Sequence, residues 1–265
     1  MPKTTTQPDI IYLKEYEVTS DFFSSSLTNQ IDLSYLLNVA LETAGHHDRH
    51  VNDYLPNPLL KEKQSWVITQ SLLQLTEWPV IKDVITVTTR VIEVNRFFVK
   101  RYFEIKRKNQ LLMEITSQYA VIDLEARKMN RIETSVLTDL NLVDTSIQQP
   151  FDKLRAPEDY AIVENQTAKI LPTDIDYNQH VNNTVYLRWC HEMLPLEIIQ
   201  NYQLESVAVK YGSELLFDDH AEIELSLPEN HLEKTELDTY QTVKNISNNK
   251  DACYLKLSWR KLNAL

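Results

Sequence analysis

The stretch DLSYLLNVALETAGHHDRHV, residues 32–51, decides the first half of the fold. Its apolar residues recur at the spacing of an amphipathic helix, and Asp32 stands where an N-cap is expected. These apolar positions are Leu33, Leu36, Leu37, Ala40, Leu41 and Ala44. A β-rich stretch precedes the helix at residues 12–18, and four follow it, at residues 66–75, 84–94, 97–106 and 111–123. Several alternate in polarity, as in ITVTTRVI (residues 85–92), which predicts a sheet with one covered face.

The second half of the chain repeats this order of elements. A short strand is expected at residues 168–171 and a helix at residues 181–194. Four β-rich stretches follow, at residues 206–217, 221–227, 237–246 and 252–262. Between the halves, over residues 138–165, periodicity fades and Pro150 and Pro157 occur, which indicates a linker. The pattern predicts an α+β fold made by duplication, and two unrelated α+β domains are the alternative.

Composition excludes several classes of function. The 265 residues, 43% hydrophobic and 25% charged, are typical of a globular protein, and no run is long and apolar enough to span a membrane. The N-terminus is polar and lacks the apolar core of a signal peptide, so a cytoplasmic protein is expected. Only two cysteines and two glycines occur, which argues against a disulfide framework and against glycine-based nucleotide loops. The net charge of −11 argues against a nucleic-acid binder.

The segment TDIDYNQHVNNTVYLRW, residues 173–189, concentrates polar side chains directly before the second helix. The backbone amides and positive dipole end of a helix start suit a developing oxyanion, although an elaborate helix cap is the structural alternative. A calcium loop is excluded, because Gln179 stands where glycine is needed and Val185 where an acidic ligand is needed. The HHxxH cluster at residues 46–50 lacks a nearby Glu or a third ligand at useful spacing. Neither a metal nor a cofactor is therefore expected.

The string Asp174-Ile-Asp-Tyr-Asn-Gln-His-Val-Asn-Asn-x-x-Tyr186 resembles the signature of the acyl-ACP thioesterases of plants and bacteria. Those enzymes are tandem hotdog proteins, and the duplicated layout covers nearly the whole chain. In that family a glutamate in the strand after the helix completes the site. The segment KYGSELL, residues 210–216, is similar and puts Glu214 in that place. The resemblance implies that the catalytic group is Asp176, Asn178, His180 and Glu214.

The residue types suggest how such a group would work. Glu214 could act as general base toward water, and His180 could share that task or protonate the leaving sulfur. Asn178 could orient water or the carbonyl, with Asp176 holding Asn178 or His180 in place. A covalent acyl-Glu214 intermediate is also open. Plant members often have a cysteine directly after the glutamate, but here that residue is Leu215, which disfavours a thiol nucleophile.

The resemblance also assigns a role to the first half of the chain. Residues 1–145 are expected to form an N-terminal hotdog domain that holds the acyl chain, residues 146–165 a linker, and residues 166–265 the catalytic hotdog domain. Candidate acyl-chain contacts are Leu37, Leu41, Trp66 and Ile68, nearly all of which could equally be plain core. The partner, acyl carrier protein, is acidic, so a basic docking patch around Arg101 and Arg107 is expected, with a merely solvated strand face as the alternative.

Three other functions compete with this interpretation. A hotdog hydrolase acting on acyl-CoA would share the fold and the water chemistry. A non-catalytic acyl-binding module would keep the fold but would have no need for Glu214 beside His180. A hotdog dehydratase would need a different His and acid arrangement and normally a glycine-rich stretch. A monomer and a homodimer of tandem chains both fit, since the duplication already supplies one hotdog pair.

Overall fold

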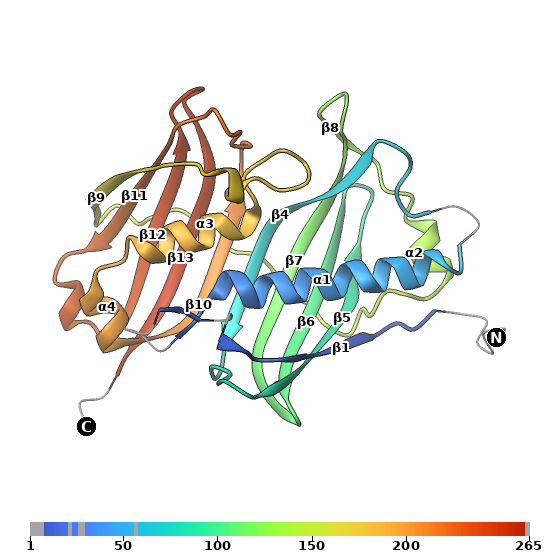
Figure 1. The fold of residues 1–265 in the computed structure, drawn as a ribbon, viewed down its shortest axis with the longest axis horizontal. Helices are drawn as coiled ribbons and strands as arrows, with labels where there is room; N and C mark the ends of the chain where they lie inside the picture. Colours follow the sequence, from blue (N-terminus) through green and yellow to red (C-terminus); the bar gives the residue numbers. More distant parts are fainter. Residues whose placement is uncertain (1–7, 21–22, 26–29, 56–57, 263–265) are drawn as a thin grey trace. The chain divides into compact units, whose positions relative to one another are not determined.

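The computed structural model describes residues 8–20, 23–25, 30–55 and 58–262, so the polar start of the chain, residues 1–7, lies outside the described residues. The chain divides into two compact units, coloured along the sequence in Figure 1. The first unit comprises Met1–Asp21, Leu37–Thr69 and Glu77–Pro150, and the second comprises Phe22–Leu36, Gln70–Thr76 and Phe151–Leu265. Among the described residues, no helix has the length and apolar character needed to cross a membrane.

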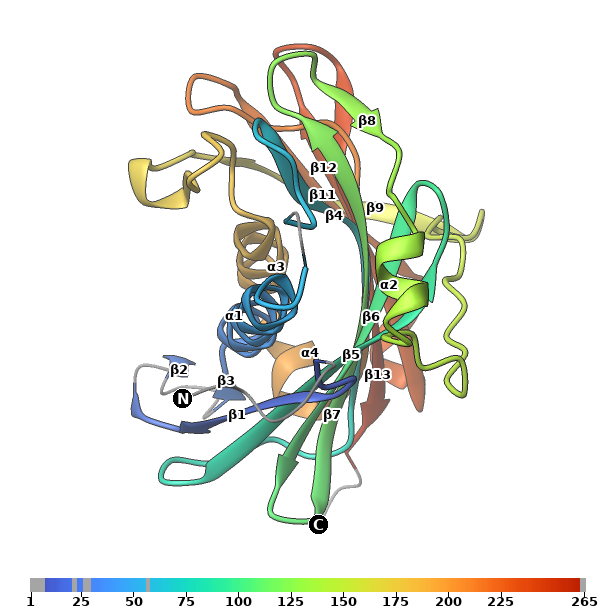
Figure 2. The ribbon, with the colours of Figure 1, turned by 90° about the vertical axis from the view of Figure 1, so that its right-hand side faces the viewer.

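In the first unit, the long helix α1 lies against the hollow side of a curved antiparallel sheet (Figure 2). The sheet order is β1-β5-β6-β7, with the first part of β4 beside β7 and the short strand β8 also paired with β7. The elements are β1 (Tyr12–Glu17), α1 (Leu33–Asn52), β4 (Gln64–Leu75), β5 (Val84–Val94), β6 (Phe98–Arg107), β7 (Gln110–Asp123), β8 (Lys128–Asn130) and α2 (Ser135–Asp139).

In the second unit, helix α3 lies against the sheet β10-β13-β12-β11-β9, with Gln70–Gln74 of β4 paired to β10 (Figure 1). A two-stranded ribbon, β2 with β3, precedes α1. The elements are β2 (Phe23–Ser25), β3 (Gln30–Ile31), β9 (Tyr160–Ala168), η2 (Pro172–Asp174), α3 (Asn183–Glu192), α4 (Leu196–Asn201), β10 (Tyr202–Tyr211), β11 (Ala221–Pro228), η3 (His231–Glu233), β12 (Glu236–Asn245) and β13 (Lys250–Lys261).

The local reasons for these elements are the ones that the sequence predicts. Asp32 Oδ1 accepts the backbone amide of Ser34 at 2.8 Å, as an N-cap does for α1. In β5 the side chains of Ile85, Val87 and Val91 are buried and alternate with more exposed neighbours, so one face is covered as expected. The α+β prediction, a long helix followed by strands and made twice, is confirmed.

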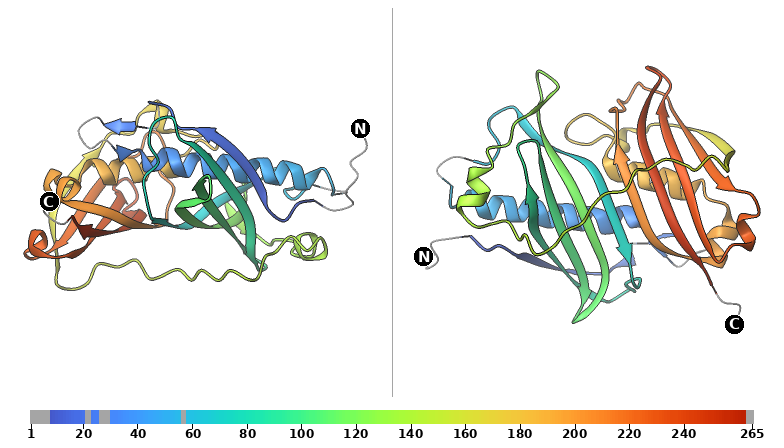
Figure 3. Two further views of the ribbon diagram at one scale, coloured as in Figure 1. Left: turned by 90° about the horizontal axis from the view of Figure 1, so that it is seen from below. Right: turned by 180° about the vertical axis from the view of Figure 1, so that it is seen from behind.

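Two expected strand boundaries are wrong. The strand expected at residues 168–171 is instead β9, Tyr160–Ala168, which starts inside the expected linker. Most of its side chains are exposed, as on an edge strand, so it carries no alternation that periodicity could detect. The strand expected at residues 206–217 ends at Tyr211, and residues 212–217 form a loop. Between α2 and β9 the chain runs without regular elements, and in the second unit it crosses the sheet face opposite α3 (Figure 3).

A buried polar cluster joins α1 to β6 in the first unit. The guanidinium of Arg101 pairs with the Asp48 carboxylate, and its Nη1 lies 3.0 Å from His47 Nδ1. Because arginine can only donate, Nδ1 is the acceptor, and Nε2 of His47 donates to the carbonyl of Asp9 at 3.0 Å. His47 is therefore neutral. Burial lowers the pKa of His47 from 6.5 to about 4, and the Arg101 charge acts in the same direction.

The depressed pKa of His47 predicts an acid-labile contribution to stability. A neutral His47 stabilises the fold fully above pH 6.5, and this contribution is lost as the pH falls from 6.5 toward about 4. Chemical denaturation should be measured for the wild type and for His47→Gln at a series of pH values. The difference between their unfolding free energies should change by on the order of 3 kcal/mol between pH 6.5 and about pH 4, and it should stay constant at lower pH. The comparison removes the opposing titration of Asp48, which both proteins share. Parallel curves would contradict a neutral His47.

Candidate active site

The polar segment before α3 is anchored by a buried carboxylate. Asp174 accepts the backbone amide of Leu171 at 2.8 Å through Oδ2, and its Oδ1 accepts from Arg188 of α3. The carbonyl of Asp174 also accepts the amide of Asn182 at 2.8 Å. Asn182 in turn caps α3, because its Oδ1 accepts the amide of Thr184 at 3.0 Å. Both ends of the loop are therefore held against the start of α3.

Asp176 shapes the loop through backbone contacts. Its Oδ1 accepts the amides of Asn178 at 2.8 Å and of His180 at 3.3 Å, and its own amide donates to the carbonyl of His180 at 2.8 Å. Gln179 closes this turn with a φ of 66°, a left-handed conformation that costs energy for a residue other than glycine. Asp176 therefore positions the two neighbouring candidate residues by fixing their main chain.

His180 and Glu214 meet side chain to side chain. His180 Nε2 lies 3.1 Å from Glu214 Oε2, and the side chains are 10% and 46% exposed. A backbone hydrogen bond between the residues that follow His180 and Glu214 supports this contact, since the amide of Val181 donates to the carbonyl of Leu215 at 2.9 Å. A half-exposed carboxylate held by a buried imidazole can accept a proton from water while staying oriented.

The loop that carries Glu214 depends on a close approach of two backbones. The amide of Gly212 donates to Ala252 at 2.8 Å and that of Ser213 to Asp251 at 2.9 Å. A Cβ on Gly212 would clash with the carbonyl oxygen of Asp251. Buried Asn245 holds the other side, with its Nδ2 2.9 Å from Asp219 Oδ2 and 3.5 Å from the Glu214 carbonyl. The sequence reasoning missed Asn245, because a single asparagine at the end of a strand gives no signal.

The side chains of Asn178 and Tyr186 also lie at this site. Asn178 is half-buried, and no group in the described part of the chain hydrogen-bonds its side-chain amide. Buried Tyr186 packs beneath the loops. Burial raises the pKa of Tyr186, and the nearby Glu214 and Asp176 carboxylates raise it further, so its hydroxyl stays protonated.

Both cysteines are unsuited to nucleophilic attack. Cys190 and Cys253 are fully buried, and burial raises the pKa of each thiol above its ordinary value. The thiolate, which is the reactive form, is therefore disfavoured at neutral pH.

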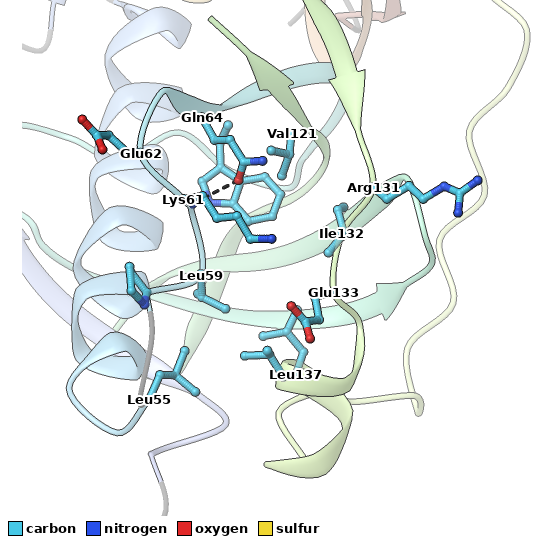
Figure 4. Close-up of a pocket in the computed structure, with 13 residues that line it drawn as sticks. Leu55, Leu59, Lys61, Glu62, Gln64, Val121, Arg131, Ile132, Glu133 and Leu137 are labelled. Carbon is cyan, nitrogen blue, oxygen red and sulfur yellow. Dashed lines mark hydrogen bonds between the residues drawn. The ribbon is translucent and has the colours of Figure 1, made fainter.

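The four candidate acyl-chain residues all lie in the first unit, and one of them, Trp66, lines a hollow formed by described residues. Leu37 and Ile68 are buried in the core, and Leu41 is half-buried. Trp66 lines a hollow of about 720 Å³ together with Leu55, Leu59 and Leu137 (Figure 4). This hollow lies between the loop after α1, strands β4 and β7, and the segment leading into α2. An acyl-chain role for each of the four residues stays a prediction.

The expectation that Arg101 lies on an exposed docking surface is wrong. Its side chain is 8% exposed and is occupied by Asp48 and His47. Arg107 is 24% exposed, but its guanidinium pairs with Glu77 at 2.6 Å and with Asp83 at 3.0 Å. The number of cations along a strand does not reveal that these two arginines are already paired, because their carboxylate partners come from other segments of the chain.

Removal of Arg101 should therefore affect folding. Arg101→Met leaves the Asp48 carboxylate buried without its partner, which should cost about 3–5 kcal/mol of unfolding free energy. The double variant Arg101→Met/Asp48→Leu removes both charges and should recover most of that loss. Urea denaturation measures both. A single variant as stable as the wild type would show that the cluster is not formed.

The two glycines of the chain offer a matched pair of substitutions. Gly212→Ala should destabilise the protein by about 1–3 kcal/mol, because the new Cβ collides with the Asp251 backbone. At Gly45, in α1, the added Cβ would meet only Arg49 Nη1 at 3.6 Å, so Gly45→Ala should stabilise by about 0.4–1 kcal/mol. Thermal unfolding compares them. Equal midpoints for the two variants would refute the backbone contact at Gly212.

Comparison with known proteins places this chain in a family. The family model described as "Acyl-ACP thioesterase N-terminal domain" matches residues 9–140, and the one described as "Acyl-ACP thioesterase C-terminal domain" matches residues 159–261. A chloroplastic acyl-[acyl-carrier-protein] hydrolase of Cuphea viscosissima is 24% identical over 95% of this chain and 62% of its own length. An oleoyl-acyl carrier protein thioesterase of Arabidopsis thaliana is 23% identical over 78% of this chain and 60% of its own length. The chain thus spans less than two thirds of these relatives.

Solved structures share the fold. The 12:0-ACP thioesterase from Umbellularia californica superposes with a TM-score of 0.79 at 17% identity, over 96% of this chain and 95% of that one. An acyl-ACP thioesterase from Bacteroides thetaiotaomicron gives a TM-score of 0.75 at 21% identity, over 95% of this chain and 98% of that one. The fold is therefore the tandem hotdog that the sequence predicts. With both family models matched in chain order, the chain belongs to the acyl-ACP thioesterase family.

Proposed function

We propose that this protein hydrolyses the thioester between a fatty acyl group and acyl carrier protein, with water as the nucleophile. The observation that carries the proposal is the 3.1 Å contact between His180 Nε2 and Glu214 Oε2 beside the start of α3. The names of the relatives support the substrate class, since they describe hydrolases of acyl carrier protein thioesters. Because the names of the similar proteins cite different acyl groups, oleoyl in one and 12:0 in another, the proposal covers fatty acyl thioesters as a class.

In the proposed reaction Glu214 is the general base. An ionised carboxylate only accepts, so its Oε2 accepts a hydrogen bond from His180 Nε2–H, and its other oxygen can accept one from a water molecule. That water loses a proton to Glu214 as its oxygen bonds to the thioester carbon. The carbon–sulfur bond then breaks, and the proton held by Glu214 passes to the leaving sulfur. The products are a free fatty acid and the thiol of the carrier.

The neighbouring groups have supporting roles in this proposal. Asn178, whose amide is available, orients the water or the carbonyl oxygen. The backbone amides at the start of α3 favour the negative charge that develops on that oxygen. Asp176 fixes the main chain of Asn178 and His180 and so keeps the group preorganised. The cysteines have no part, because both thiols are buried.

The acyl group needs an apolar site, and the first unit has a suitable one. The hollow beside Trp66 has about 720 Å³ and is lined mainly by leucine, isoleucine, valine and proline side chains. This volume lies within the usual range for small-molecule sites. Five polar or charged residues also line it and give it a polar side: Lys61, Glu62, Gln64, Arg131 and Glu133 (Figure 4). We propose that this hollow accommodates hydrocarbon.

The test is release of free thiol from a panel of acyl-ACPs and the matching acyl-CoAs. Glu214→Gln and His180→Ala should each lower kcat for acyl-ACP by about 10²–10⁴-fold, because each removes part of the proton-transfer group. Glu229→Gln, an exposed carboxylate in the turn after β11, is the matched control and should keep wild-type activity. Thermal unfolding checks that the variants fold.

Other outcomes would replace the proposal. Faster turnover of acyl-CoA than of acyl-ACP would keep the chemistry and change the substrate class. Binding of acyl ligands without turnover of either thioester would make the protein a binding module.

A further inference from the structure

A cationic hollow lies on the face of the second unit opposite α3. Its floor is Gln70 of β4, Lys210 of β10 and Tyr254 of β13, which are direct cross-strand partners. The preceding residue on β10, Val209, is buried, so Lys210 points to the other side of the sheet. Residues Phe151–Arg155 form the wall, in the segment that crosses this face (Figure 3). The hollow has a volume of about 520 Å³.

The hollow gathers cations that form no ion pair with any other residue in the described part of the chain. Among the described residues, no carboxylate lies within 4 Å of the charged groups of Lys153, Arg155 or Lys210. By contrast, Lys244 and Lys256 on the same sheet each pair with a carboxylate, at 2.6 Å and 2.9 Å. Asp152 is the one acid in the lining of the hollow. Residues 151–265 contain 11 Lys and Arg against 19 Asp and Glu, so this concentration of positive charge runs against the local background.

The loops around the candidate catalytic pair have the opposite charge. Asp176, Asp218 and Asp219 lie on the two segments that carry His180 and Glu214. An acidic partner would be repelled by these loops and attracted by the hollow. Its charged surface would thus meet the enzyme away from the reacting atoms, and a flexible arm would have to bring the thioester to them.

The hollow is close in sequence to the loop that carries Glu214, and hydrogen bonds connect the two. Lys210 and Glu214 are four residues apart, which bounds their Cα separation at about 14 Å. Tyr254 on the floor donates to the Asp251 carboxylate, and the Asp251 carbonyl accepts the amide of Ser213. A partner seated on the hollow therefore contacts the strands that position Glu214.

We propose that the cationic hollow is the docking site for the acidic surface of the acyl carrier protein. This inference rests on the proposed function and adds the place at which the carrier binds. Carboxylates of the carrier pair with Lys153, Arg155 and Lys210, while half-buried Phe151 and Leu154 offer apolar contact. Docking of this kind lowers KM and raises the rate of association without changing the chemical step.

The experiment measures KM and kcat for three thioesters of one acyl group: acyl-ACP, acyl-CoA and acyl-N-acetylcysteamine, which lacks both protein and phosphate. Lys153→Glu/Arg155→Glu should raise KM for acyl-ACP by about tenfold and leave kcat within about twofold. Lys210→Glu should raise the same KM, because it faces the same hollow. The wild-type KM for acyl-ACP should rise with salt, and the dependence should weaken in the double variant.

The matched control is Lys234→Glu/Lys250→Glu, which changes the net charge equally at exposed, unpaired lysines outside the hollow. It should leave KM for acyl-ACP within about twofold of the wild type. An unchanged KM in the hollow variants, or an equal rise in the control, overturns docking while leaving the proposed hydrolysis intact. An equal rise in KM for acyl-ACP and acyl-CoA in the hollow variants would show a phosphate site, and a rise for all three thioesters would show damage to the fold. Either result overturns the proposed docking site. If the wild-type protein hydrolyses none of the three thioesters, the proposed function itself is wrong.

Discussion

The backbone hydrogen bond from Val181 to Leu215 is the constraint on which the candidate site depends. It joins the loop before α3 to the loop after β10, two segments that folding brings together from distant parts of the sequence. With this bond in place, His180 and Glu214 face each other without either being fully buried. The supporting contacts of Asp174, Asn245 and Gly212 each hold one of the two loops against the rigid sheet or helix behind it.

Charge has different roles in different parts of this molecule. In the first unit, Arg101 and Asp48 are buried and hold α1 to the sheet, so they contribute to the interior. In the second unit, Asp174 performs a similar task for the loop before α3. The cations of the hollow are exposed and have no carboxylate partner within residues 8–20, 23–25, 30–55 and 58–262, which leaves their charge available to another molecule. The net charge of −11 conceals this difference, because it sums interior and surface groups alike.

Periodicity in the sequence predicts the helices and most strands closely, and α1 and β5 each bury one face as such a pattern requires. It fails for β9, whose exposed edge position leaves no pattern, and for residues 212–217, which form a loop after β10 ends at Tyr211. The segment containing Asp176 and His180 could be identified from its signature. The burial of Arg101 and the support from Asn245 could not be predicted from the sequence, since both depend on partners that only the fold brings near.

The central claim is that His180 and Glu214 act as one group. A double-mutant cycle on kcat for acyl-ACP hydrolysis tests it most directly, with His180→Ala, Glu214→Gln and the combined variant in one assay. If the two side chains form a single proton-transfer unit, the double variant should be about as slow as the slower single variant. Losses that multiply, so that the double variant falls by the product of the two single effects, would mean independent contributions and would contradict the account.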